Sequence, residues 1–325
     1  MNYKKDFFTI EQDLEKVRNK IKDTFKNDIP YVKNINNYIF SFLGKMIRPS
    51  LVFFSSKSVS QKLDSKTKEQ IIALSATVEI IHIATLIHDD IIDNAFLRRG
   101  QKSVNKKYGN NIAILIGDYL FAKAFFLLSN YFQGKVLEIL SETVASICCG
   151  EMLQVKFRFN ADLSEKKYLE IIKNKTGILM SACCETSALA VNASDKEINA
   201  LKEYGFNLGI AFQIIDDCLD FVGQEKKVKK TLGLDIENGE LTLPLIYFKK
   251  RFAKEIFSND KSKRYQEIIS FWNNNPLKRK EALDFAFKTA SRYATYAKES
   301  ISILKPSIFK DSLLNLPLKV IERSN

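Results

Sequence analysis

Residues that interrupt helices are scarce in this sequence. Its 325 residues include only 6 prolines and 12 glycines, fewer than the average usage of about 5% and 7% would give. Proline and glycine most often mark the ends of helices and the turns between strands. Their scarcity predicts long helices and argues against a fold of many short strands.

Cysteine and histidine are also few. The 5 cysteines include the adjacent pairs Cys148-Cys149 and Cys183-Cys184, no Cys-x-x-Cys spacing occurs, and there are only 2 histidines. This pattern indicates neither a zinc site nor a framework of disulfides. We expect the cysteines to be small buried side chains in a reducing compartment.

No secretory or membrane-spanning segment is predicted. Residues 1–8 are charged and lack the apolar region of a signal peptide. The most membrane-like stretch, residues 71–88, contains Glu79, His82 and His88, and titratable groups are rare in membrane spans. We therefore expect this stretch to be a buried core helix and the protein to be cytoplasmic.

Positive charge is in excess, with 50 Lys and Arg against 38 Asp and Glu and a formal net charge of +12. A basic balance suggests nucleic acid, acidic lipid or phosphorylated metabolites as partners, although a lysine-rich solvated surface has the same composition. No basic stripe interleaved with aromatic residues occurs, so we expect no nucleic-acid binding.

Helical periodicity covers most of the chain. It predicts capping boxes at Thr9–Gln12 and Ser194–Glu197 and helices over 65–92, 111–130, 135–157, 165–192, 194–221 and 241–257. The lysine-rich segment 223–240 lacks periodicity, and we expect a loop that acts as a lid over a site. No strand hairpin, interdomain linker or repeat is evident. The prediction is an all-α fold with a single domain over residues 1–325.

Two aspartate clusters carry the strongest chemical signal. The Asp-Asp-x-x-Asp pattern occurs twice between apolar residues, as Asp89, Asp90 and Asp93 and again as Asp216, Asp217 and Asp220. Carboxylates four residues apart share a helix face and destabilise a bare helix by roughly 0.2–0.5 kcal/mol. One such cluster is usually an exposed face, but two clusters in apolar surroundings favour bound cations.

Carboxylate clusters suit hard divalent cations. Mg²⁺ keeps several waters, accepts one or two carboxylates and shares its other positions with substrate phosphates. If the two helices face each other, they would hold two or three Mg²⁺ ions against a diphosphate. The ions would then neutralise the charge of a departing pyrophosphate.

A phosphate site also needs cationic residues, and the sequence offers several. Arg98 and Arg99 follow the first cluster, Lys45 and Arg48 form another pair, and His82 lies two helical turns before Asp89. Arginine forks match phosphate oxygens, whereas lysine supplies a point charge. Each pair alone is more often a solvated surface, and a lone histidine is more often core.

Together these residues resemble the trans-isoprenyl diphosphate synthases, or polyprenyl synthetases. The resemblance covers nearly the whole chain and rests on short motifs in the family's order: Gly44-Lys45-x-x-Arg48-Pro49, Leu86–Asp93 with Arg98-Arg99-Gly100, Gly117-Asp118-Tyr119-Leu120, Gly150-Glu151-x-x-Gln154, Lys175-Thr176, and Phe212-Gln213-x-x-Asp216-Asp217-x-x-Asp220. It implies an isoprenoid synthase-like helical bundle around a deep central cavity, and a homodimer.

The resemblance also implies a reaction. Metal ions draw the diphosphate from an allylic prenyl diphosphate, and the double bond of isopentenyl diphosphate attacks the resulting carbocation. A proton then leaves, with pyrophosphate as the base. The lengthened product implies peripheral contact with a membrane during its release.

Residue roles follow from the same resemblance. The implied metal ligands are Asp89, Asp93 and Asp216, supported by Asp90, Asp217 and Asp220. The allylic diphosphate would be bound by Arg98, Lys175 and Lys230, and isopentenyl diphosphate by Lys45, Arg48, His82 and Arg99. The allylic carbocation would be faced by Thr176 and Gln213.

The chain departs from the family pattern at two places. Glu240 stands where the family usually has a phosphate-binding lysine, and we expect the lysines at 226, 227, 229 and 230 to compensate. Pro317 falls inside the last helical pattern and should kink or break it. Arg323 resembles the family's terminal arginine.

Product length is suggested by the residues one turn before Asp89. In family members that stop at fifteen carbons a bulky aromatic commonly blocks the channel there, whereas this chain has Ala84 and Thr85. It also lacks the two-residue insertion of the short-chain bacterial type. The pattern resembles medium- and long-chain synthases that supply quinone side chains. We expect a floor deeper in the channel, at Phe121, Phe125 or Phe126.

Several alternatives stay open. A class I terpene cyclase needs no isopentenyl diphosphate site, so Lys45, Arg48 and Arg99 argue against it. A non-catalytic subunit of a heteromeric synthase tends to lose one aspartate cluster, and both are whole here, although Glu240 favours this reading. A geranylgeranyl-type synthase of shorter product and a purely structural helical protein are the remaining alternatives.

Overall fold

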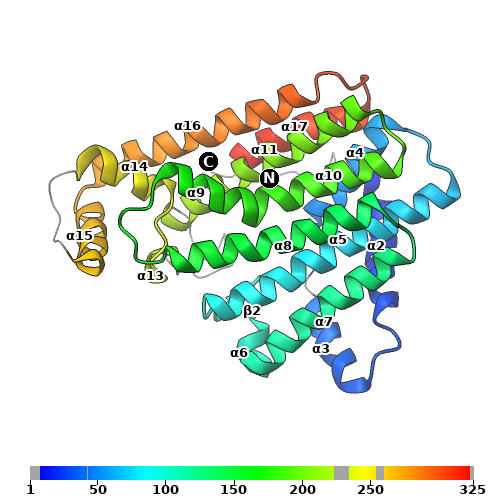
Figure 1. The fold of residues 1–325 in the computed structure, drawn as a ribbon, viewed down its shortest axis with the longest axis horizontal. Coiled ribbons are helices and arrows are strands. Elements are labelled where there is room, and N and C mark those ends of the chain that lie inside the picture. Colours follow the sequence, from blue (N-terminus) through cyan, green and yellow to red (C-terminus); the bar gives the residue numbers. More distant parts are fainter. Residues whose placement is uncertain (1–7, 42, 223–233, 254–259, 323–325) are drawn as a thin grey trace. The chain divides into compact units, whose positions relative to one another are not determined.

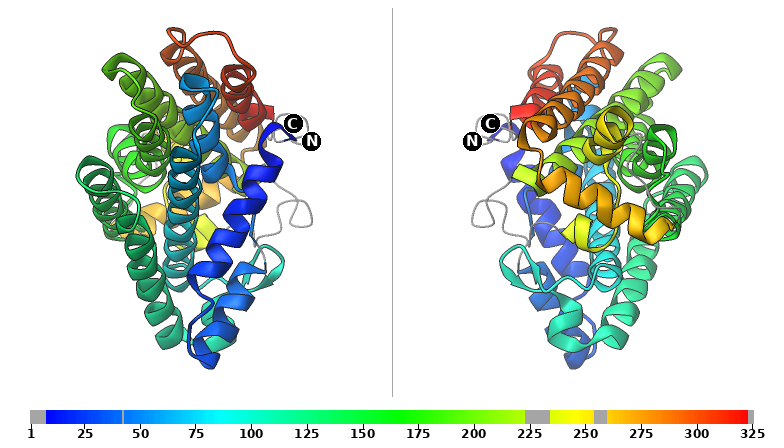
Figure 2. Two further views of the ribbon diagram at one scale, coloured as in Figure 1. Left: turned by 90° about the vertical axis from the view of Figure 1, so that its right-hand side faces the viewer. Right: turned by 90° about the vertical axis from the view of Figure 1, so that its left-hand side faces the viewer.

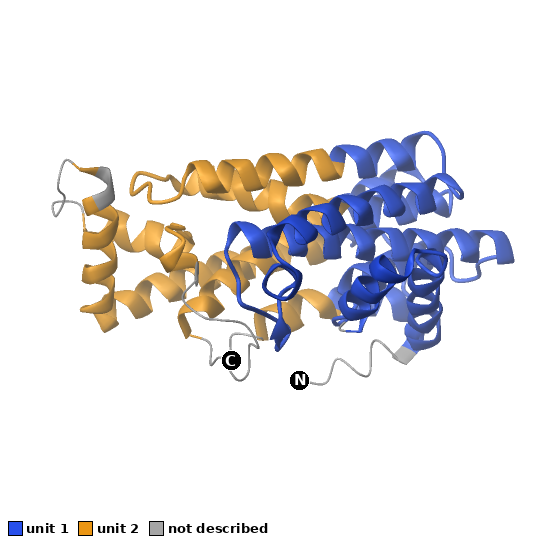
Figure 3. Ribbon diagram, turned by 90° about the horizontal axis from the view of Figure 1, so that it is seen from below, with its two compact units in different colours: residues 1–142, 182–202, 301–314 blue, residues 143–181, 203–300, 315–325 orange. Residues whose placement is uncertain are grey.

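Figure 1 shows the fold in the computed structural model, which describes residues 8–41, 43–222, 234–253 and 260–322. The described chain is almost entirely helical, as predicted. Contacts group it into two compact units, coloured separately in Figure 3. The first unit comprises Met1–Glu142, Ala182–Lys202 and Ile301–Leu314, and the second Thr143–Ser181, Glu203–Ser300 and Asn315–Asn325. The single domain around a deep central cavity stays a prediction.

The first unit opens with a 3-10 turn, Phe8–Ile10, followed by α2 (Glu11–Thr24), α3 (Pro30–Phe40), α4 (Ile47–Val59), α5 (Ser65–Ile92), β1 (Leu97–Arg98), β2 (Gln101–Lys102), α6 (Val104–Tyr108) and α7 (Asn110–Ser129). Four helices continue from one unit into the other, namely α8 (Lys135–Lys156), α10 (Ile178–Ala190), α11 (Asp195–Val222) and α17 (Ile308–Glu322). The second unit adds α9 (Glu165–Ile172), the π-turn Lys173–Gly177, α13 (Leu234–Glu237), α14 (Leu243–Phe252), α15 (Lys261–Asn273) and α16 (Pro276–Ser300).

Helix α5 is the core of the first unit. It packs against α2, α4 and α7, which Figure 2 shows from two further directions. Every residue from Ile71 to Ile81 is buried, as expected for a helix that is apolar on all sides. The Asp64 carboxylate caps its start by accepting the N–H of Thr67 at 2.8 Å.

Two helices, α5 and α7, are long and apolar enough to cross a membrane by length and composition. In α5 78% of the apolar window is buried inside the structure, which agrees with the predicted core helix. In α7 only 39% of the window is buried. Helix α7 therefore leaves an apolar face uncovered.

A strand hairpin follows α5, which the sequence did not predict. Leu97 pairs with Lys102 and Arg98 with Gln101 in an antiparallel arrangement. The turn between them has positive φ angles at Arg99 (53°) and Gly100 (79°), the geometry that closes a two-residue hairpin. Strands of two residues are too short to leave a periodic signal.

The two predicted capping boxes have different outcomes. At Ser194 the box is confirmed, because the Glu197 carboxylate accepts the Ser194 N–H at 3.0 Å and its hydroxyl at 2.7 Å. The box at Thr9 and Gln12 is wrong, because α2 starts one residue later and its N-cap is Ile10, with no side-chain cap. The 3-10 turn places Thr9 within helical backbone rather than at the cap.

Two further predictions concern Pro317 in the last helix and the lid over residues 223–240. The break predicted at Pro317 is wrong, because α17 runs from Ile308 to Glu322 with the proline inside it. The buried Leu316 and Val320 anchor the helix on both sides of the proline, and a kink stays a prediction. The lid expected at 223–240 lies mostly outside the described residues. Of that segment, 234–240 is described and includes α13.

The second unit is held by an aromatic cluster. The Phe248 ring of α14 lies 5.1 Å from Trp272 and 5.4 Å from Phe271 of α15, centroid to centroid. Trp272 also packs on Phe221 near the end of α11 at 4.9 Å. These contacts anchor the helix that carries the second aspartate cluster.

A buried ion pair joins three helices of the first unit. Lys57 of α4 lies 2.5 Å from the Asp13 carboxylate of α2, and Lys68 of α5 lies 3.4 Å from it. Burial would raise the pKa of Asp13, but the hydrogen bond and charge of Lys57, with the charge of Lys68, hold it below its ordinary value of 3.8.

We expect Asp13→Asn to lower the free energy of unfolding by about 1.5–3 kcal/mol near pH 7, because hydrogen bonds to charged groups contribute about that much. A lowered carboxyl pKa stabilises the fold above its ordinary value, and the gain is lost as pH falls through the folded-state value. Urea unfolding at several pH values should therefore show the difference shrinking in acid. Glu15→Gln, at an exposed ion pair on the same helix, should change stability by less than about 0.5 kcal/mol. An equal effect of both variants would contradict the assignment.

Candidate active site

The last turn of α5 carries the first aspartate cluster. Asp89 and Asp90 lie in the helix, and Asp93 is the C-cap residue, whose N–H donates to the Asp89 carbonyl at 2.8 Å. Helical spacing is therefore kept as far as Asp93. Asp89 and Asp93 are half-buried on one face, where two carboxylates can supply oxygen ligands.

Asp90 is engaged with the hairpin. Its Oδ1 accepts hydrogen bonds from Nε of Arg98 at 2.8 Å and from Nη2 of the same guanidinium. The Asp90 side chain is only 3% exposed, and its backbone carbonyl accepts from Asn105 at 3.1 Å. Asp90 thus holds Arg98 against α5, while its predicted part in metal binding stays a prediction.

The glycine of the Gly44-Lys45-x-x-Arg48 motif makes room for Arg99. A Cβ added at Gly44 would lie 2.7 Å from Nη2 of Arg99. Arg99 and Met46, which precedes α4, both have left-handed backbones, with φ of 53° and 54°. Such strain concentrates at functional sites. The structure therefore brings Arg99 beside the segment that carries Lys45 and Arg48.

Sequence reasoning missed Glu79, a carboxylate 2% exposed on α5. Burial raises its pKa, and the charges of Arg48 and Arg99 oppose that rise. Glu79 therefore lies within electrostatic reach of two cations predicted to bind isopentenyl diphosphate. The only signal in the sequence is an acid inside an otherwise apolar helix, three residues before His82.

His82 shares this cluster as a neutral ring. Burial, followed by the charges of Arg48 and Arg99, holds the pKa of His82 well below its ordinary value. A neutral imidazole has one N–H donor and one acceptor nitrogen. His82 can therefore donate one hydrogen bond to an anion without adding charge.

His88 explains the Gly117-Asp118 motif. A Cβ added at Gly117 would overlap the His88 ring. Nε2 of His88 lies 3.2 Å from the Ile114 carbonyl and 3.6 Å from the Asp118 carboxylate. The ring thus joins α5 to α7 beside Asp89.

The predicted chain-length residues lie at different depths. Ala84 is fully buried, and the Thr85 hydroxyl donates to the His82 carbonyl at 2.8 Å. Phe121 is half-buried with its centroid 5.9 Å from that of His88, and Phe125 is half-buried as well. Phe126 is 64% exposed, so it lines no enclosed channel within its unit.

In the second unit Lys175 and Thr176 lie on the π-turn Lys173–Gly177, which divides the single helix predicted over 165–192. Such turns are frequently found at functional sites. Close backbone contacts hold the turn, because a Cβ added at Gly150 would lie 2.9 Å from the Lys175 nitrogen. One added at Gly209 would lie 2.7 Å from Cα of Gly177.

A hydrogen-bond chain links the predicted catalytic residues of this unit. The Thr176 hydroxyl donates to Oε1 of Gln213 at 2.7 Å, and Nε2 of Gln213 donates to Asp217 at 2.8 Å. Tyr168, which sequence reasoning missed, donates to the other Asp217 oxygen at 2.6 Å. Burial raises the pKa of Asp217 to about 7, against the effect of these two hydrogen bonds.

The outer members of the second cluster are Asp216, which is half-buried, and Asp220, which is buried. They lie four residues apart on α11, as predicted. Lys175 is placed by Glu151 of α8, whose carboxylate lies 2.8 Å from its ammonium group. Lys230 and Arg323, also predicted to act here, lie outside the described residues.

Metal binding depends on more than these side chains. Within the described ranges, no three His, Cys, Asp or Glu side chains converge closely enough to hold an ion by themselves. Each cluster offers two outer carboxylates, a donor set suited to a hard cation whose shell is completed by water and phosphate. The residues present therefore fit a divalent cation that binds together with its substrate.

The crossing of Gly177 and Gly209 generates a stability prediction. We expect Gly209→Ala to lower the free energy of unfolding by about 1–3 kcal/mol, because the added methyl group overpacks a tight crossing. The matched control is Gly177→Ala, whose Cβ would lie no closer than 3.5 Å to its neighbours. This change should leave stability unchanged or raise it by up to about 1 kcal/mol. Urea unfolding measures both, and equal destabilisation would show that the crossing is not tight.

Comparisons with known proteins agree with this site. The polyprenyl synthetase family matches residues 29–283. Heptaprenyl diphosphate synthase component 2 of Bacillus subtilis is 30% identical over 318 residues, covering 96% of this chain and 88% of the relative. Geranylgeranyl diphosphate synthase of Sulfolobus acidocaldarius is 31% identical, with 93% and 92% covered.

A solved structure also matches this chain over nearly its whole length. Polyprenyl synthase from Caulobacter crescentus, complexed with calcium and isoprenyl diphosphate, matches with a TM-score of 0.86 and 30% identity over 98% of this chain and 97% of that chain. That match agrees with the use of a divalent metal and prenyl diphosphate substrates in this family. The chain belongs to the polyprenyl synthetase family and is a trans-prenyltransferase with polyprenyl diphosphate synthase activity.

Proposed function

We propose that this enzyme condenses isopentenyl diphosphate with farnesyl or geranylgeranyl diphosphate, with Mg²⁺, to give an all-trans product longer than fifteen carbons, for quinone side chains. The observation that carries the length is Ala84, a small, fully buried residue of α5 that lies five positions before Asp89. Relatives that make heptaprenyl and octaprenyl chains support it. A geranylgeranyl-type product is the second candidate, supported by relatives of that kind.

Different residues would bind the diphosphates of the two substrates. Isopentenyl diphosphate would be held by Lys45, Arg48, Arg99 and neutral His82. Glu79 would partly offset the charge of the two arginines, within whose electrostatic reach it lies. Arg98 and Lys175 would bind the allylic diphosphate. Bound Mg²⁺, held by the outer aspartates, would neutralise the departing pyrophosphate. Oriented binding of this kind lowers the barrier without a nucleophilic side chain.

The hydrogen-bond chain of the second unit suits a carbocation. The Thr176 hydroxyl directs its proton to Gln213, so the lone pairs of its oxygen stay available to an electron-deficient carbon. Gln213 is in turn fixed by Asp217. The proton lost from the intermediate would leave with pyrophosphate.

A second copy of the chain would cover the uncovered face of α7. Leu115 and Phe126 of this helix are 63% and 64% exposed, and Ile114 is 46% exposed. Exposed apolar faces of this kind mark protein interfaces, and most soluble oligomers are symmetric homo-oligomers. We propose a homodimer through this face, which sedimentation of the purified chain tests.

We also propose a cytoplasmic location with peripheral contact at a membrane. All five cysteines are free thiols in the structure, which suits a reducing compartment. Cys183, Cys184 and Cys218 are buried as expected, whereas the expectation of burial is wrong for Cys148 and Cys149, which are exposed. A long prenyl chain is poorly soluble, so its release calls for an apolar acceptor such as a bilayer.

The direct test incubates the purified chain with isopentenyl diphosphate, farnesyl diphosphate and Mg²⁺, and chromatography of the extracted lipid gives the product length. A geranylgeranyl product would favour the shorter-chain candidate. No elongation by the pure chain would favour a subunit of a heteromeric synthase.

We expect Phe121→Ala and Phe125→Ala to lengthen the product, because each removes bulk from the half-buried side of α7 and deepens the channel. Tyr31→Ala, which removes an exposed aromatic ring from α3 of the same unit, is the control and should leave the length unchanged. Product chromatography measures all three. Unchanged length in both test variants would remove these two residues as the floor.

We expect Glu79→Gln to raise the KM for isopentenyl diphosphate about tenfold, equivalent to about 1.4 kcal/mol, because Arg48 and Arg99 lose the charge that fixes them. Stability should stay the same or rise, since a desolvated carboxylate becomes a neutral amide. Glu69→Gln, exposed on the same helix, is the control. An equal rise in the KM for the allylic substrate would show a general disturbance instead.

A further inference from the structure

The end of α8 presents a row of polar side chains in the second unit. Glu151, Gln154 and Arg158 follow one another at spacings of three and four residues, which places them on one face of the helix and of the turn that continues it. The Arg158 N–H donates to the Val155 carbonyl at 3.2 Å, so the turn is kept beyond the last helical residue.

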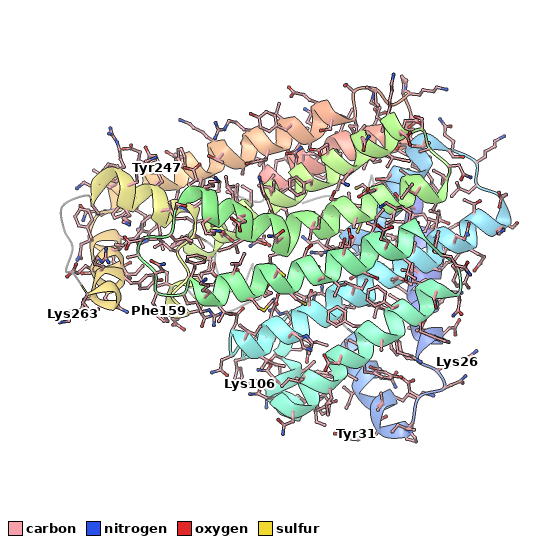
Figure 4. The ribbon with its side chains drawn as sticks, viewed as in Figure 1. Lys26, Tyr31, Lys106, Phe159, Tyr247 and Lys263 are labelled. Carbon is pink, nitrogen blue, oxygen red and sulfur yellow. The ribbon has the colours of Figure 1, made fainter. Side chains whose placement is uncertain are left out.

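Phe159, labelled in Figure 4, ends this turn with a left-handed backbone, φ 55°. Its N–H donates to the Gly239 carbonyl at 2.7 Å. A Cβ added at Gly239 would lie 2.6 Å from the Phe159 ring, so this contact requires glycine. The backbone therefore fixes Glu240 beside the end of α8.

The Glu240 carboxylate is held by two donors from that row. Its Oε1 accepts from Nε2 of Gln154 at 2.5 Å and from Nη2 of Arg158 at 3.2 Å. The side chains of Arg158 and Glu240 are 16% and 14% exposed. The Glu240 N–H is also bonded, to the Asp235 carbonyl at 2.7 Å. This pair is more rigid than a solvated surface ion pair.

The pair lies on the face of α8 that also carries Glu151, the partner of Lys175. One turn before Gln154, Glu151 holds Lys175 at 2.8 Å. Along this face of α8, two cations, Lys175 and Arg158, are thus each held by a carboxylate.

We propose that Arg158 binds the allylic diphosphate and that Glu240 is the positioning residue that orients its guanidinium. Glu240 itself repels phosphate, whereas the Arg158 guanidinium that it holds carries the positive charge that phosphate needs. A guanidinium has five N–H donors in a planar fork, so it can bind a carboxylate and a phosphate together. This inference rests on the proposed prenyl transfer for its substrate and deepens it.

A purely structural pair is the alternative, since the contact also ties the turn after α8 to residues 239 and 240. The structural role and the binding role predict different effects when Arg158 and Glu240 are substituted. A structural tie tolerates neutral partners or a reversed charge without any change in anion affinity. A diphosphate site needs a positive charge at one of the two positions.

The test measures binding of inorganic pyrophosphate with Mg²⁺ by calorimetry, together with KM for the allylic substrate and for isopentenyl diphosphate. Arg158→Gln should weaken pyrophosphate binding and raise the allylic KM by about tenfold, with the KM for isopentenyl diphosphate within about twofold. Arg158→Lys, which keeps the charge, should retain most of the affinity. Glu240→Gln should have a smaller effect, because the guanidinium remains but is less fixed.

The double variant Arg158→Gln with Glu240→Lys moves the positive charge across the contact and should restore affinity to within about threefold of the unchanged chain. Arg264→Gln is the matched control, because Arg264 forms a similar ion pair with Asp162 at 3.1 Å, and it should leave pyrophosphate binding unchanged.

Two results would overturn the inference. If the Arg158→Gln variant binds pyrophosphate normally, with or without a loss of thermal stability, the pair has only a structural role. If the double variant binds pyrophosphate no more tightly than the Arg158→Gln variant, the contribution of Arg158 is not its positive charge. Pyrophosphate titration needs no turnover. If the chain fails to elongate farnesyl diphosphate, the proposed function is refuted, but the affinities of the variants for pyrophosphate can still be compared.

Discussion

Removing arginine and lysine side chains from water is unfavourable unless a carboxylate accompanies each of them. The described parts of both units follow this constraint. Asp90 holds Arg98 in the first unit, and Glu151 holds Lys175 in the second. The buried Glu79 lies in the field of Arg48 and Arg99. Within each unit, cations are therefore held in place by carboxylates, as the proposed binding of diphosphates requires.

The same constraint separates the members of each aspartate cluster. The middle residues, Asp90 and Asp217, are buried, and their carboxylate oxygens accept hydrogen bonds from protein donors. Among the outer residues, Asp89, Asp93 and Asp216 stay half-buried, where carboxylates can meet a hydrated cation, whereas Asp220 is buried. Identical side chains one residue apart on a helix thus face different surroundings, because each step turns the side chain by about 100°.

Glycine and strained backbone supply the close approaches that these contacts need. Gly44 admits the Arg99 guanidinium, Gly117 admits the His88 ring, and Gly209 admits the backbone of the π-turn. Two left-handed residues that are not glycine also lie at these contacts. They are Arg99, whose guanidinium packs against Gly44, and Phe159, which directly follows Arg158. Packing elsewhere compensates such local strain.

Sequence alone determined the helical character, the long core helix 65–92 and the two aspartate patterns. These are local properties, since periodicity, capping and spacing depend on residues a few positions apart. The hairpin after α5, the π-turn inside 165–192 and the unbroken helix through Pro317 needed the structure, because contacts distant in sequence outweigh local preference there. Only tertiary packing could bring Glu79 within electrostatic reach of two arginines or pair Glu240 with Arg158, because the partners come from segments tens of residues apart. The sequence supplied the charged groups, and the fold decided which of them lie together.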